Sequence, residues 1–207
     1  MLKSQEKIAE ALKKFVPDEA IPYLIELMFS HHVNFKVTKP RATKHGDFRP
    51  KHNGKPHRIT VNGDLNPYAF LITTIHEFAH LITYEHFGRH VKSHGREWQN
   101  EFRKLLIPII ERKILPHNVE AALNRSLHNL KASTCTDVGL YRALKEYDHF
   151  DDNLVLLEQL EKDEKFRLGK RIFKRGELRR TRFLCEEIPT KREFLVSGLA
   201  EVERYDE

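Results

Sequence analysis

The sequence has little cysteine and no long apolar run. Its two cysteines, Cys135 and Cys185, are too few for a disulfide framework or a four-thiolate zinc site. No segment approaches the roughly 18 consecutive apolar residues of a membrane-spanning helix, so no membrane partner is expected. The first residues lead into an amphipathic pattern without the apolar core of a signal peptide. Together these features predict a protein of the reducing cytoplasm.

Histidine and clustered positive charge are what the sequence has in excess. Thirteen histidines are spread along 207 residues, and the net charge is +6. Residues 165–182 contain nine Lys and Arg residues against Glu177 alone, and residues 36–58 contain eight against Asp47 alone. The rest of the chain is net acidic. Two basic stretches in an otherwise acidic chain indicate a polyanionic partner, and the histidines indicate a bound metal ion.

The hydrophobic pattern predicts an α+β fold. After two short N-terminal helices, Val33 to Thr38 alternates as a strand, and Ile59 and Val61 indicate a second strand that closes at Asn62. Between them, residues 39–57 contain three prolines and two glycines, which favours a loop or an irregular hairpin. We therefore expect a small N-terminal sheet.

A buried helix and a β-rich end follow this sheet. Residues 67–88 are apolar almost all round a helix, as in a central helix, and Ser93 is expected to cap the next helix. After Asp152 short apolar alternations are separated by glycine and proline, which is typical of antiparallel strands. The sequence thus predicts a mainly helical domain over residues 1–150 and a β-rich C-terminal appendage over residues 151–207.

The central helix contains His76-Glu77-Phe78-Ala79-His80. Residues four apart share one helix face, so two imidazoles can bind one ion with Glu77 beside it. Zinc in such a site lowers the pKa of a water molecule toward ~7 and polarises a carbonyl, while the carboxylate accepts the proton of the water. Three ionisable groups on one turn of an apolar helix are costly to bury unless they share a partner. The pattern predicts a zinc site with Glu77 as the catalytic residue.

A catalytic zinc site needs a third protein ligand. The downstream candidates are His86, His94, Glu97 and Glu101. His86 has the spacing of a motif in which a glycine breaks the helix, but Thr83 stands at that position and no methionine follows for the accompanying Met-turn. The chain must turn back after Gly88, and a histidine at the first turn of the returning helix can reach the ion. We therefore favour His94, with Glu101 second and His86 third.

The pairing of His76-Glu77-x-x-His80 with His94-Gly95-x-x-Trp98 resembles the SprT-like zinc metalloproteases, which include the Spartan-type proteases for DNA–protein crosslinks. The preceding Arg41-x-x-Lys44-x-Gly46 is also similar, and the resemblance covers about residues 15–105. It implies a zincin-like metalloprotease core, Zn²⁺ held by His76, His80 and His94, Glu77 as catalytic residue, and a protein substrate.

The resemblance differs at the C-terminal end of the chain. Many relatives end in a zinc ribbon with paired cysteines, whereas Cys185 alone remains in the matching region. One thiolate cannot form that site. The appendage is therefore expected to be a basic β-hairpin region that resembles a degenerate zinc ribbon.

The basic stretch 165–182 interleaves cations with Phe166 and Phe173. Cations neutralise phosphates and exposed rings stack on unpaired bases, so single-stranded or damaged DNA is an expected partner. The same alternation also fits a strand whose cations face the solvent while both rings lie in the core on the opposite face. The residues expected to contact nucleic acid are Lys170, Arg171, Lys174, Arg175, Arg179 and Arg180. The stretch 36–58 fits either the edge of the active-site cleft or a solvated loop.

Two functions are consistent with these features. The first is a zinc metallopeptidase, acting through an activated water on protein substrates that include DNA-bound proteins. The alternative is a nucleic-acid-binding protein whose zinc site is structural or vestigial. Steep salt dependence of binding that survives loss of metal would favour the alternative.

Overall fold

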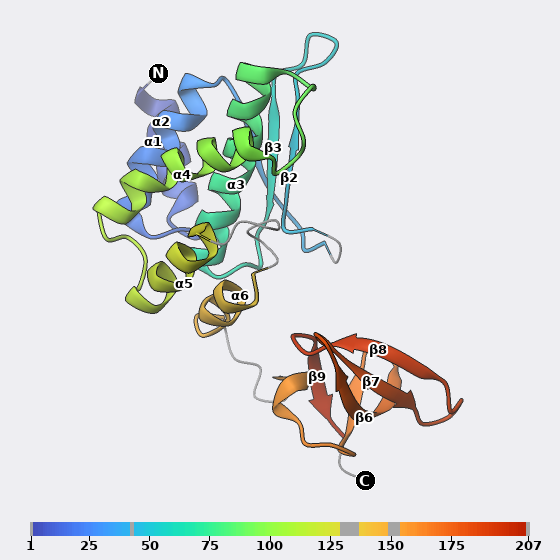
Figure 1. Ribbon diagram of the computed structural model, residues 1–207. Coiled ribbons are helices and arrows are strands. Elements are labelled where there is room, and N and C mark those ends of the chain that lie inside the picture. The colour runs from blue at the N-terminus through green and yellow to red at the C-terminus, as the bar shows by residue number, and fades with distance from the viewer. Residues whose placement is uncertain (1, 42–43, 129–136, 149–153, 206–207) are drawn as a thin grey trace. The chain divides into compact units, whose positions relative to one another are not determined.

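The computed structural model has the expected α+β fold, with a mixed three-stranded sheet, a helical region and a six-stranded antiparallel sheet (Figure 1). It describes residues 2–41, 44–128, 137–148 and 154–205. The chain divides into two compact units, residues 1–148 and 149–207. The expected boundary between residues 150 and 151 lies outside the described residues.

The first unit combines a small sheet with helices. Its elements are α1 (Leu2–Leu12), the 3-10 helix η1 (Asp18–Ala20), α2 (Ile21–Ser30), β1 (Asn34–Thr38), β2 (Gly46–Arg49), β3 (Arg58–Asn62), α3 (Pro67–Phe87), α4 (Arg96–Glu111), α5 (His117–His128) and α6 (Val138–Lys145). Strand β3 is central, because β1 pairs with it in parallel and β2 pairs with it antiparallel. Strand β2 is thus an edge strand, and it lies within the segment expected to be a loop or an irregular hairpin.

Helix α3 is the buried centre of this unit. It begins after Asn66, whose side chain accepts hydrogen bonds from the backbone N–H groups of Tyr68 and Ala69. It ends at Gly88, whose φ of 67° lies in the left-handed region. It runs alongside β3 and β2 (Figure 1). Although α3 is strongly apolar, none of the described helices is long and apolar enough to cross a membrane.

Helix α4 packs back against α3 after a turn over residues 88–95. The predicted cap at Ser93 is wrong, because the N-cap is Gly95 and no side chain caps the helix. His94 therefore lies in the turn, with a φ of 60°, and not in the first helical turn. A Cβ on Gly95 would lie 2.9 Å from the Lys92 carbonyl oxygen, so the tightness of this turn requires glycine and sets where α4 begins.

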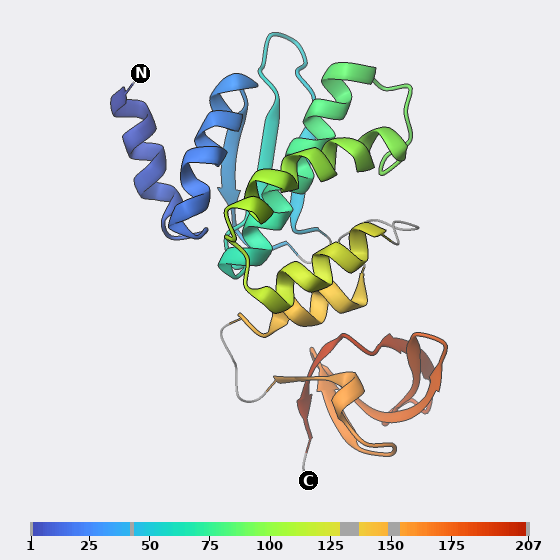
Figure 2. The ribbon, with the colours of Figure 1, turned by 60° about the vertical axis from the view of Figure 1, so that its left-hand side comes forward.

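The second unit is a curved antiparallel sheet with its own core (Figure 2). Its strands are β4 (Leu154–Leu156), β5 (Lys165–Leu168), β6 (Arg171–Arg179), β7 (Arg182–Glu187), β8 (Glu193–Ser197) and β9 (Glu201–Arg204), and the 3-10 helix η3 (Leu157–Gln159) follows β4. The strand order is β4-β9-β5-β6-β7-β8. Alternate residues of β5 to β7 point inward, so Phe166, Phe173, Phe183 and Cys185 are buried together.

Candidate metal centre

Three histidines from two parts of the first unit meet at their Nε2 atoms. His76 and His80 come from α3, and His94 comes from the turn before α4. The Nε2–Nε2 distances are 3.1 Å for His76–His80, 3.0 Å for His80–His94 and 3.0 Å for His76–His94. Within the described residues, this is the group of His, Cys, Asp or Glu side chains whose ligand atoms converge as they would around a metal ion. The structure therefore contains a possible metal site.

The donor set of this cluster fits zinc. All three imidazoles point Nε2 at a common point. Each Nε2 carries either a proton or a lone pair, and three such nitrogens cannot all form hydrogen bonds with one another. A cation that accepts one lone pair from each ring resolves this conflict. Two nitrogens bound to one zinc ion in tetrahedral geometry lie about 3.3 Å apart, close to the observed spacings. Three protein ligands is also the number found in catalytic zinc sites.

The protein environment keeps the three imidazoles neutral. Burial, together with the neighbouring His80 and His94, lowers the pKa of His76 to about 2. Burial and then His94 lower the pKa of His80 to about 4, and burial lowers the pKa of His94. Metal ligation requires unprotonated imidazoles. The cluster is therefore ready to bind a cation at neutral pH without first losing protons.

Residues of α4 hold the histidines in place. The Gln99 side chain donates from Nε2 to the His94 carbonyl oxygen at 3.1 Å. The buried indole of Trp98 has its centroid 4.7, 5.3 and 4.7 Å from the ring centroids of His76, His80 and His94, in that order. Trp98 is the single tryptophan of the chain. Its packing restricts all three rings and makes it a built-in fluorescent reporter of the centre.

Glu77 is buried between α3 and the edge strand β2. The Phe48 backbone N–H donates to its carboxylate. A Cβ on Gly46 would lie 2.7 Å from Glu77 Cγ, so a larger residue at position 46 would displace the Glu77 side chain. Burial, and then the charge of Asp47, raise the pKa of Glu77 to about 7. A carboxyl group with a pKa near the working pH can both accept and donate a proton.

The other ligand candidates are not part of the cluster. His86 Nδ1 lies 3.6 Å from Glu101 Oε1, and Lys104 Nζ lies 2.9 Å from the same oxygen. Glu97 lies in the first turn of α4. Neither glutamate, nor His86, places a ligand atom with the three converging nitrogens. The structure thus brings His94, and not these alternatives, to His76 and His80.

The basic stretch of the second unit separates into paired and unpaired cations. Arg171 forms an ion pair with Glu187, and Lys174 Nζ lies 3.4 Å from Asp163 Oδ1. Arg175 Cζ lies 4.0 Å above the Phe183 ring. In the described part of the chain, by contrast, the exposed side chains of Lys170, Arg179 and Arg180 form no ion pair. Acidic residues on β7 and before β5 therefore neutralise part of the charge seen in the sequence.

The aromatic residues of this stretch belong to the core. Phe166 and Phe173 are 0% and 3% exposed, and their rings stack at a centroid distance of 5.5 Å. Neither ring can stack on a base without unfolding the sheet. Of the two predicted arrangements, stacking on a base is wrong and a strand with its rings in the core is confirmed.

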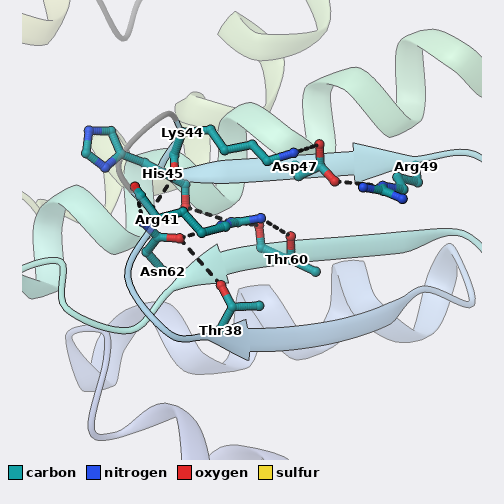
Figure 3. Close-up of polar contacts among 8 residues, drawn as sticks. All are labelled: Thr38, Arg41, Lys44, His45, Asp47, Arg49, Thr60 and Asn62. Atoms are coloured by element: carbon teal, nitrogen blue, oxygen red, sulfur yellow. Dashed lines mark hydrogen bonds and ion pairs between the residues drawn. The ribbon is translucent and has the colours of Figure 1, made fainter.

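The N-terminal basic stretch lies partly beside the metal centre. Gly46 and Phe48 of β2 approach Glu77, as described above. Lys44 and Arg49 both bind Asp47, at 2.7 and 2.9 Å (Figure 3). The roles of the Phe48 amide and of Gln99 could not be predicted from the sequence, because backbone and supporting contacts leave no motif. The glycine at position 46 was the one available signal.

No family model and no solved structure matches the chain. Fold and site together define an α+β protein with a buried cluster of His76, His80 and His94 that could hold a metal ion.

Proposed function

We propose that this chain is a zinc-dependent peptidase of the SprT-like type. The observation that carries the proposal is the convergence of three neutral Nε2 atoms beside a buried carboxyl group with a pKa of about 7. Zinc held by His76, His80 and His94 would supply Lewis-acid chemistry, polarising a peptide carbonyl and making a water molecule easier to deprotonate.

Glu77 supplies the acid–base part of the proposed reaction. Its carboxylate accepts the proton of the attacking water and later donates it to the amine that leaves when the peptide C–N bond breaks. The raised pKa suits both steps, because the group gains and loses a proton near neutral pH. The hydrogen bond from the Phe48 N–H fixes the orientation of the carboxylate at the edge of β2.

The substitution Glu77→Gln tests this assignment. We expect the variant to keep about one zinc per chain, measured by elemental mass spectrometry, and to lose about 10²–10⁴-fold in the rate of hydrolysis of fluorescently labelled casein. Glu85→Gln is the matched control, because Glu85 lies on the same helix but pairs with His31 at 2.7 Å, outside the cluster. Full activity of Glu77→Gln, or zinc-loaded wild type that leaves casein intact, contradicts the proposed mechanism.

A second proposed function is nucleic-acid binding by the second unit, with single-stranded or damaged DNA as partner. It is favoured by Arg179 and Arg180 at the turn between β6 and β7, which are exposed and form no ion pair with the residues that the structure describes. Combined with the peptidase, it would make DNA-bound proteins the substrates. If zinc proves structural or the hydrolysis vestigial, DNA binding would be the main function, and it would persist after the metal is removed with a chelator.

A further inference from the structure

Arg41 lies between β1 and β2, and its side chain binds residues at the end of β3 (Figure 3). The Arg41 guanidinium donates from Nε to Asn62 Oδ1 at 2.7 Å and from Nη1 to Thr60 Oγ1 at 3.1 Å. Its Nη2 donates to the His45 carbonyl oxygen at 3.4 Å. One side chain thus binds two residues of β3 and the residue that precedes β2.

Asn62 is the buried partner in this network. It is 1% exposed, and both polar atoms of its amide are fully used. Its Oδ1 accepts from Arg41 and from Thr38 Oγ1, the latter at 3.4 Å. Its Nδ2 donates to the backbone carbonyls of Arg41 and Lys44 at 3.3 and 3.1 Å. Because an unsatisfied buried amide is costly, these contacts fix the path of the backbone at Arg41 and at Lys44 strongly.

This path sets the register of β2. The Asn62 backbone N–H donates to the His45 carbonyl at 2.8 Å, and Gly46 follows directly, paired with Val61. Backbone N–H groups of an antiparallel strand point alternately toward and away from the paired neighbour. A slip of one residue would therefore turn the Phe48 N–H away from Glu77. It would also bring a side chain against the Glu77 carboxylate, where Gly46 now leaves room.

We infer that Arg41 and Asn62 are positioning residues that set the register of β2 and, through Gly46 and Phe48, hold the Glu77 carboxylate in place. The consequence for catalysis rests on the proposed peptidase function, whereas the consequence for β2 does not.

The first test is hydrogen exchange of the Phe48 amide, followed by NMR in the full chain labelled with ¹⁵N-phenylalanine. Arg41→Lys keeps the positive charge but loses the planar fork that reaches four acceptor atoms. We expect the Phe48 amide of this variant to exchange at least about tenfold faster, because its acceptor is no longer in register. Arg49→Lys is the matched control, since Arg49 lies on the same strand and pairs with Asp47 at 2.9 Å. It should leave the exchange rate unchanged.

The second test separates positioning from general destabilisation. For Arg41→Lys we expect kcat on labelled casein to fall by about tenfold or more, with KM within about twofold and one zinc per chain retained. Asn62→Asp provides a second variant, because it keeps Oδ1 but replaces a donor that serves two carbonyls. It should change the Phe48 exchange rate and kcat in the same direction as Arg41→Lys.

Two results would overturn the inference. One is an unchanged Phe48 exchange rate in both variants. The other is a loss of kcat that only follows loss of zinc, since the network would then support the metal ligands and not Glu77. If zinc-loaded wild type hydrolyses nothing, the proposed function fails, and the Phe48 exchange rates still decide whether the network sets the register of β2.

Discussion

The two groups of charged and polar residues that stand out in the sequence have opposite surroundings in the structure. On α3, His76 and Glu77 sit among buried residues such as Ile75 and Phe78, where water cannot solvate them. On β6, Arg171 and Lys174 lie at half-exposed positions and find acidic partners on neighbouring segments. Polar groups therefore indicate a site most strongly where the surrounding fold removes both water and ordinary ion-pair partners.

Removing one ligand of the cluster should have the largest effect on metal binding. We expect His94→Ala to weaken zinc binding by more than the 10–100-fold that loss of a supporting residue costs. Titration with cobalt as a substitute for zinc, with Trp98 fluorescence as the signal, measures the affinity of the site for a divalent metal, because the indole centroid is 4.7 Å from the His94 ring centroid. His90→Ala is the control, since His90 is an exposed histidine of the same turn. Unchanged affinity in His94→Ala would instead point to Glu101 or His86.

The next effect concerns the contact between β2 and Glu77. We expect Gly46→Ala to displace the carboxylate, because the added Cβ would lie 2.7 Å from Glu77 Cγ. The rate of casein hydrolysis should fall about 10–100-fold while zinc content stays the same. The control is a double-mutant cycle with Glu77→Gln, in which Gly46→Ala should have almost no further effect. Additive losses would show that Gly46 acts elsewhere.

Local pattern was enough to predict part of this centre. The spacing of four between His76 and His80 places both on one face of any helix, and the apolar residues around them predict a buried one. The choice of His94 followed from the need for the chain to turn back after Gly88, and the structure places its Nε2 3.0 Å from that of His80. These features depend on neighbours in sequence, which periodicity and spacing describe well.

Features that depend on strand order could not be predicted from the sequence. The contact of Gly46 with Glu77, and the network of Arg41 with Asn62, exist because β3 lies between β1 and β2. No periodicity specifies that order. The Ser93 cap was a wrong prediction for a related reason. The left-handed turn at His94, fixed by packing against α3, delays the start of α4 to Arg96.

Acid should destabilise the metal-free first unit. The native pKa values of His76 and His80 are about 2 and about 4, whereas the ordinary value is 6.5, so on acidification the unfolded chain takes up these protons first. Their contribution to stability is complete above pH 6.5 and is lost as the pH falls toward 4 and then 2. Glu77, with its pKa raised to about 7, opposes this trend between pH 7 and 4.5. The three histidines together outweigh it, because the pKa of each is lowered and each therefore makes the unfolded chain more stable as the pH falls.

Urea unfolding with a chelator present, monitored by Trp98 fluorescence, measures the free energy of unfolding of this unit. We expect that free energy to decrease from pH 6.5 to pH 4.5. In His80→Gln, which cannot take up this proton, the decrease should be shallower. Equal slopes in the two proteins would mean that His80 is not kept neutral by burial.

The smallest effect on DNA binding is expected from substituting the paired cations of the second unit, Arg171 and Lys174. If the sheet binds DNA, removing the unpaired cations with Arg179→Gln and Arg180→Gln should reduce the slope of log K against log salt concentration by about 1.4 for a single strand. Fluorescence anisotropy with a short labelled oligothymidine measures this slope. Arg171→Gln with Lys174→Gln removes the same formal charge, but these cations already hold Glu187 and Asp163. Their loss should reduce the slope less than the loss of Arg179 and Arg180. An equal reduction in the two double variants would show that ion-paired cations of the sheet bind phosphate as well as the others do.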